Sequence, residues 1–152
     1  MKTKTDTLLK LWLETRTRFS IQLEKLTEED LQKKLGSSPN SFGFLIRHIG
    51  EVELLFAKNV FGDSSVKVTA KTVIEKRDIG EWTDLNALKN YVGESFEKLK
   101  SIVEKQTDKD WERTITTKEF GTKTKAKAFG RIVSHTAYHS GQLSIINKYE
   151  TN

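Results

Sequence analysis

Long stretches free of helix-breaking residues limit the folds open to this chain more than any other feature. Its 152 residues include one proline and nine glycines. Four of the stretches place apolar residues every three or four positions, which is the period of an amphipathic α-helix. We therefore expect long helices at about 5–26, 41–61, 84–106 and 127–149.

Each of these helices carries an apolar stripe that it cannot bury alone. The stripes contain large side chains, two for each helix in turn: Trp12 and Phe19, Ile49 and Phe56, Leu88 and Val92, and Ile132 and Leu143. Packing four stripes around one shared core is the economical way to remove them from water. The sequence thus predicts an all-α four-helix bundle that forms a single domain over residues 1–152.

The connections between the helices carry signals of their own. An acidic turn after Thr27 predicts a short helix that reaches Leu35. The connection at 63–82, between the second and third helices, is long for a compact domain. Connections of this length often serve function or are ordered by packing, and this one permits a crossover without requiring it. The β-rich segment 113–117 followed by Gly121 favours a small hairpin before the last helix.

Composition restricts the location and the chemistry of the protein. No segment approaches the roughly 20 apolar residues that span a bilayer, and no secretory leader is recognisable, so we expect a cytoplasmic protein without a membrane partner. The chain has no cysteine, which excludes disulfides and cysteine-ligated metals. Any thiol that takes part in its chemistry must therefore come from a substrate or cosubstrate.

The charge balance disfavours nucleic-acid binding. The excess of 26 Lys and Arg over 21 Asp and Glu gives a net charge of only +5. One basic cluster stands near the last helix, with Phe120 and Phe129 beside it: Lys118, Lys123, Lys125, Lys127 and Arg131. A cluster of this kind is usually a solvated surface, so nucleic acid is the less favoured partner.

The three histidines are the strongest candidates for a functional site. His135 and His139 form an H-x-x-x-H pair, and this spacing places both rings on one face of a helix. His48 lies between Leu45 and Val52 on the inward stripe of another helix. Three neutral imidazoles suit a divalent transition metal with positions open to water or substrate. The alternative is ordinary packing, but unpartnered buried imidazoles would each cost about 1–3 kcal/mol.

Residues near the histidines have less specific patterns. Gln142 lies one turn beyond His139, where it either contacts a cofactor or metal-bound ligand or satisfies a polar position in the core. Glu51 could orient an imidazole or act as a base, and Arg131 and Tyr138 could contact an anionic cosubstrate. We interpret Glu51 as a solvated or edge carboxylate and the other two as surface or packing residues, which is the commoner role of such side chains. Gly141 predicts close approach of another helix, within the bundle or across a dimer.

Two segments resemble the DinB/YfiT-like family. These are the second-helix segment SFGFLIRHIGE at 41–51 and the last-helix segment HTAYHSGQL at 135–143, which has H-x-x-x-H followed by x-G-Q. The resemblance implies a four-helix bundle, often a homodimer, in which His48, His135 and His139 bind a divalent metal. Zinc or nickel is the leading candidate, with iron or manganese as alternatives. Ser140 departs from the charged residue that many relatives carry at that position.

The resemblance also implies a class of activity. Some relatives are metal-dependent transferases that attach a low-molecular-weight thiol, such as bacillithiol or mycothiol, to an electrophile, and others are isomerases with a thiol cofactor. A small-molecule thiol and an electrophile are therefore the expected partners. Two alternatives stay open at this point: a metal-dependent hydrolase that activates water, and a metal-binding protein without turnover.

Overall fold

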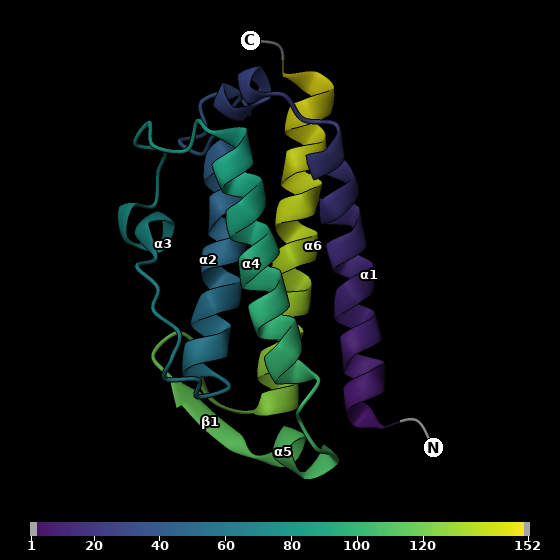
Figure 1. The fold of residues 1–152 in the computed structure, drawn as a ribbon. Coiled ribbons are helices and arrows are strands. Elements are labelled where there is room, and N and C mark those ends of the chain that lie inside the picture. The colour runs from purple at the N-terminus through teal and green to yellow at the C-terminus, as the bar shows by residue number, and fades with distance from the viewer. Residues whose placement is uncertain (1–2, 151–152) are drawn as a thin grey trace.

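Four long helices make up most of the computed structural model, which describes residues 3–150 (Figure 1). They confirm the predicted bundle and are α1 (Lys4–Glu24), α2 (Phe42–Asn59), α4 (Leu85–Val103) and α6 (Lys125–Tyr149). Helix α2 packs mainly against α4, and α1 packs mainly against α6. Contacts between α2 and α6 and between α1 and α4 complete the bundle.

The long connection after α2 is a crossover that sets the topology. Figure 1 shows α2 and α4 running in the same direction, while α1 and α6 run in the opposite direction. The chain must therefore return along the full length of the bundle between α2 and α4. It does so over the outer side of α2 and carries the short helix α3 (Lys71–Glu75). The sequence permitted this topology, and the structure selects it.

Side-chain caps fix where the long helices begin. The hydroxyl of Ser41 accepts a hydrogen bond from the backbone N–H of Phe44 at 3.1 Å and thereby starts α2. Asp84 caps α4 by accepting from the backbone N–H of Ala87 at 2.9 Å. An aspartate carboxylate has two acceptor oxygens, and its negative charge interacts favourably with the positive end of the helix dipole at the N-terminus.

The shorter elements lie at the two ends of the bundle. The predicted helix after Thr27 is only a single 3₁₀ segment, η1 (Glu28–Gln32). Next to the other end of α6 are α5 (Asp108–Glu112) and an antiparallel pair, β1 (Thr114–Thr117) and β2 (Gly121–Thr124). Gly121 begins the second strand with a φ of +70°, which only glycine adopts at low cost. The predicted hairpin is thus confirmed.

The core divides into two clusters along the bundle axis. The cluster on the η1 side includes Phe19, Ile49 and Leu143, and the cluster on the hairpin side includes Trp12 and Ile132. All five side chains are 0% exposed, as the apolar stripes predicted. On α6, His135 and His139 lie in sequence between the residues that enter the two clusters, whereas His48 on α2 lies between Ile46 and Ile49 of the η1-side cluster.

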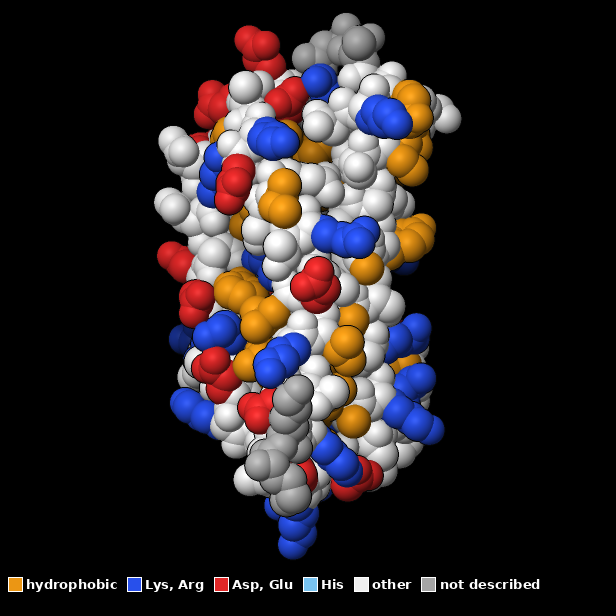
Figure 2. All heavy atoms as spheres, turned by 90° about the vertical axis from the view of Figure 1, so that its right-hand side faces the viewer, with side chains coloured by type: hydrophobic (Ala, Val, Ile, Leu, Met, Phe, Trp, Pro, Cys, Tyr) orange, Lys and Arg blue, Asp and Glu red, His pale blue; other side chains and the backbone are white. Residues whose placement is uncertain are grey.

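The surface over α1 has the mixed character of an ordinary solvated face. Figure 2 shows its apolar side chains interspersed with lysine, arginine and carboxylate groups. Two of the exposed apolar residues of α1 are Leu11 and Ile21. The expected homodimer stays a prediction. No helix within residues 3–150 combines the length and apolar character needed to cross a membrane.

Candidate metal centre

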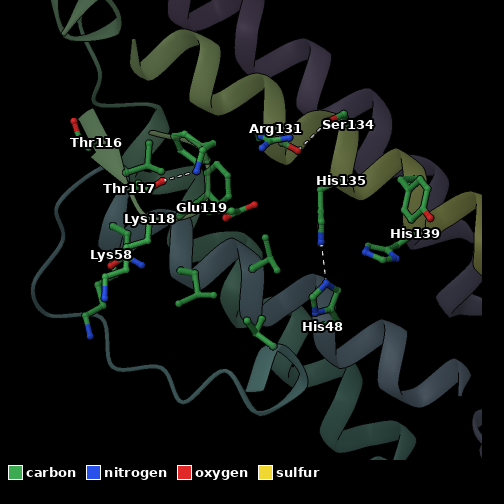
Figure 3. Close-up of a pocket in the computed structure, with 18 residues that line it drawn as sticks. His48, Lys58, Thr116, Thr117, Lys118, Glu119, Arg131, Ser134, His135 and His139 are labelled. Carbon is green, nitrogen blue, oxygen red and sulfur yellow. Dashed lines mark hydrogen bonds between the residues drawn. The ribbon is translucent and has the colours of Figure 1, made fainter. Parts of the chain in front are cut away.

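Neighbouring helices bring the three histidines together. His48 lies on α2, and His135 and His139 lie one turn apart on α6, as their spacing predicted. One ring nitrogen from each residue lies within 4.8 Å of the other two. The Nε2 atoms of His48 and His135 are 3.0 Å apart (Figure 3). This cluster can hold a metal ion.

Hydrogen bonds at the backs of two rings decide which nitrogens face the cluster. Nδ1 of His48 lies 2.9 Å from the hydroxyl oxygen of Thr72, in α3. Nδ1 of His139 lies 2.6 Å from Oε1 of Gln142. Because Nδ1 of each ring is engaged there, Nε2 is the nitrogen left to bind a metal. Partners of this type usually orient metal-binding imidazoles.

A buried carboxylate fixes the protonation of His48. The hydroxyl of Thr72 donates its proton to Oε2 of Glu51, so the hydroxyl oxygen must accept from Nδ1–H of His48. The unprotonated Nε2 of His48 then faces the other rings. Glu51 also accepts from the backbone N–H of Thr72 at 2.9 Å and from Nε of Arg47 at 2.9 Å.

The interpretation of Glu51 as a solvated or edge carboxylate was wrong. Its side chain is 0% exposed because the crossover that carries Thr72 covers this face of α2. Gln142 acts in a similar way at the other ring. Its amide oxygen can only accept, so Nδ1 of His139 carries the proton and Nε2 is unprotonated. That Gln142 contacts a cofactor remains a prediction.

The state of His135 supports the fit of the cluster to a metal. Its Nδ1 is buried and has no hydrogen-bond partner within residues 3–150. Two unprotonated nitrogens, those of His48 and His139, are directed toward its ring. Without a cation, Nε2–H of His135 can donate to the unprotonated Nε2 of His48 at 3.0 Å. A divalent metal would take the place of that proton, and three neutral imidazole nitrogens are a common ligand set for zinc and related divalent ions. The residues present therefore fit the metal.

Burial keeps the three imidazoles in the neutral form that binds metal. Desolvation, with a smaller contribution from His139, lowers the pKa of His48 to about 4. Desolvation and the two neighbouring rings lower the pKa of His135 to about 2. Burial also lowers the pKa of His139, although its bond with Gln142 opposes that change. Protons thus compete weakly for these nitrogens at neutral pH.

The histidines occupy one end of an open cavity of about 1040 Å³ between α2 and α6. Figure 3 shows the cavity extending from the three rings toward the β1–β2 turn. Val52, Phe56 and Phe120 contribute an apolar wall, and Tyr138, which is 65% exposed, lines the side beside the rings. The volume is in the range of small-molecule binding sites. A ligand can therefore reach the cluster from solvent.

Comparison with known proteins identifies the family. The family model described as "DinB superfamily" matches residues 11–143. The chain belongs to the DinB superfamily. A search of proteins of curated function finds no match to it.

A solved structure shares the fold of this DinB protein. It is a histidine-to-alanine mutant of a mycothiol-dependent maleylpyruvate isomerase, with a TM-score of 0.74 and 15% sequence identity. The match covers 94% of this chain but 63% of the isomerase chain. The present chain therefore spans less than two thirds of that enzyme. At this identity the likeness establishes the fold alone.

Sequence reasoning did not find every residue of this DinB site. Thr72 was missed because nothing in its neighbourhood reveals that the crossover brings it to His48. Lys58 lines the cavity but is an isolated lysine in sequence, whereas Lys118, which also lines it, was identified only as part of the basic cluster near the last helix. Gly141 was expected to admit another helix, yet a Cβ placed there would meet nothing within 4 Å. Close approach within the bundle is therefore wrong, and the dimer alternative stays a prediction.

Proposed function

We propose that this DinB protein is a divalent-metal-dependent enzyme that transfers a low-molecular-weight thiol to an electrophilic small molecule. The convergence of three imidazole nitrogens at one end of an open cavity carries the proposal. Within residues 3–150 the cluster offers three protein ligands, so a bound metal would keep coordination positions for an incoming group. The cavity supplies the space for that group and for a second reactant.

The chain's own residues have distinct roles in this proposal. His48, His135 and His139 would hold the metal, and Thr72 and Gln142 would keep two of the rings in the tautomer that presents Nε2. A divalent metal held there would lower the pKa of a thiol and favour thiolate near neutral pH. Val52, Phe56 and Phe120 would exclude water from the reacting groups.

Two further observations support a thiol as the incoming group. The chain contains no cysteine, so a nucleophilic sulfur must be supplied by a cosubstrate. The structurally similar protein is described as a mycothiol-dependent isomerase, which makes transfer followed by release of the thiol a related outcome. For the metal we propose zinc or nickel, with iron or manganese as alternatives, because imidazole nitrogen suits each of these ions.

The competing functions are less well supported. A metal-binding protein without turnover has no need for a ligand-sized cavity beside its metal, and this cavity measures about 1040 Å³. A hydrolase would use water at the same open position, and a thiol assay distinguishes it. Nucleic-acid binding loses support because Phe129 is 0% exposed and cannot stack on a base.

Elemental analysis of the purified protein is the first test. We expect about one divalent metal per chain and its loss in His48→Ala, because two imidazoles hold such ions weakly. Tyr149→Ala is the control, since Tyr149 is 66% exposed near the end of α6. A thiol-conjugation assay with a panel of electrophiles follows. Metal-loaded protein that binds no thiol and accelerates no conjugation would contradict the proposed function.

A further inference from the structure

Three cationic side chains line the cavity on the hairpin side of the histidine cluster. Lys58 comes from the last turn of α2, Lys118 from the β1–β2 turn and Arg131 from α6. Figure 3 shows them on the side of the cavity formed by the hairpin and the start of α6. Among the residues that the structure describes, Glu119 is the one carboxylate that lines the cavity, so the charge on this side of the cavity is net positive.

These three cations are not neutralised by the protein. None of them forms an ion pair within residues 3–150, whereas other surface lysines do, such as Lys98 with Asp63 at 3.0 Å. Unpaired surface lysines are common and solvated, so three of them are not by themselves evidence of an anion-binding site. Here, however, three separate elements place them around one cavity that also contains an apolar wall and a candidate metal centre.

Arg131 is the best placed of the three for specific recognition. It precedes His135 by one helical turn, so its side chain projects beside the histidine cluster. Its guanidinium carbon lies 5.6 Å from the centre of the Phe120 ring, which limits the directions that the side chain takes. A guanidinium presents paired N–H donors that match the two oxygens of a carboxylate, which a lysine does not.

We propose that the small molecule bound in this cavity carries a carboxylate, which Arg131 binds with the help of Lys58 and Lys118. This inference rests on the proposed function and names its substrate class: a carboxylate-bearing thiol or a carboxylate-bearing electrophile. The reactive end of that molecule meets the histidine cluster, while its anionic end meets the hairpin side. Because these two sets of groups lie apart along the cavity, they orient the molecule as well as bind it.

Small thiols of different charge test the inference. The probes are 3-mercaptopropionate, 2-mercaptoethanol and cysteamine, titrated into cobalt-loaded protein while the sulfur-to-cobalt absorption band is recorded. We expect 3-mercaptopropionate to bind about tenfold more tightly than 2-mercaptoethanol, as a charge-assisted hydrogen bond at a solvent-accessible site would give. Cysteamine should bind most weakly. Added salt should reduce the differences.

Variants separate the cationic subsite from the metal centre. Arg131→Gln should remove most of the preference for 3-mercaptopropionate and leave the affinity for 2-mercaptoethanol unchanged. Arg18→Gln is the matched control, because Arg18 is exposed on α1 and outside the cavity lining. A second arm compares iodoacetate with iodoacetamide as electrophiles for 2-mercaptoethanol, each corrected for its uncatalysed rate. A preference for iodoacetate that Arg131→Gln removes would assign the carboxylate to the electrophile.

The outcomes distinguish this inference from the proposed function. Charge preference in either arm that depends on Arg131 supports the subsite and identifies the reactant that carries the carboxylate. Equal binding of all three thiols together with equal reaction of both electrophiles overturns the subsite and leaves thiol transfer intact. If no thiol alters the cobalt spectrum and no conjugation is accelerated, the proposed function fails and the subsite fails with it.

Discussion

Replacing Thr72 with valine would test whether the crossover holds the candidate metal centre in shape. Valine keeps the size of threonine and removes only the hydroxyl, which links Nδ1–H of His48 to the carboxylate of Glu51. Thr72 is 1% exposed, so water does not readily replace the lost group. The backbone N–H of residue 72 would still donate to Glu51, so the crossover should keep its path.

The expected magnitude follows from two lost hydrogen bonds. His48 loses its acceptor and Glu51 loses a donor, and each unsatisfied buried group costs about 1–3 kcal/mol. Without its partner at Nδ1, His48 also loses the preference for the tautomer that presents Nε2. Loss of such partners typically weakens metal binding about 10- to 100-fold. We expect a reduction of this size for zinc, measured by competition with a chromophoric chelator.

Thr5→Val is the matched control for this experiment. Thr5 is also buried, and its hydroxyl makes two hydrogen bonds, donating to the carbonyl of Gln106 at 2.6 Å and accepting from Nε1 of Trp111 at 2.7 Å. Thermal unfolding should show comparable destabilisation in the two variants, but only Thr72→Val should lose zinc affinity. Equal zinc affinity in both variants and the wild type would refute the role assigned to Thr72.

Three other measurements test separate parts of the structure. Since burial holds the pKa of His48 at about 4 and that of His135 at about 2, zinc affinity should change less than about threefold between pH 6 and 8, and release of about one proton per zinc at pH 6.5 would contradict this. Desolvation raises the pKa of Glu53 to about 7, so the folded state keeps a proton that the unfolded state loses above about pH 4.5. The wild type should therefore lose about 3 kcal/mol of unfolding free energy between pH 4.5 and 7 relative to Glu53→Gln, and parallel pH curves would refute the shift. Gly43→Ala should lower the melting temperature by several degrees, because its Cβ would lie 2.1 Å from the carbonyl oxygen of Trp82; Gly93→Ala, with nothing within 4 Å, should not.

The helices and the hairpin were predictable because their signals are local. Apolar spacing locates a helix from within the helix itself, and Trp12, Phe19 and Leu143 are buried where that spacing put them. The direction of α4 was not predictable. It depends on whether the connection after α2 returns along the bundle, and the contacts that hold that connection, such as Gly43 with Trp82, join residues far apart in sequence.

In the candidate site, too, the features with local sequence signals were predicted and those set by distant contacts were not. The His135–His139 pair follows from spacing within one helix, and the inward stripe of α2 supplied His48. Glu51 was misjudged because its face of α2 is turned away from the shared core of the bundle. The crossover covers this face, and Thr72, which contacts Glu51, lies 21 positions away in a segment without periodicity. The general tendency of glutamate to be exposed predicts its burial correctly only on a helix face that no other segment covers.

Glu51 and Glu53 show what distinguishes a buried carboxylate that the site uses from one that it does not. Both are 0% exposed on α2, and removing a carboxylate from water costs several kcal/mol unless hydrogen bonds and charge compensate. Glu51 receives bonds from Arg47 and from both the N–H and the hydroxyl of Thr72. Glu53 has Arg16 at 3.4 Å and an Oε2 without a partner within residues 3–150. The well-compensated carboxylate is the one linked to His48, which is the arrangement expected if the charge serves to orient a metal ligand rather than to stabilise the fold.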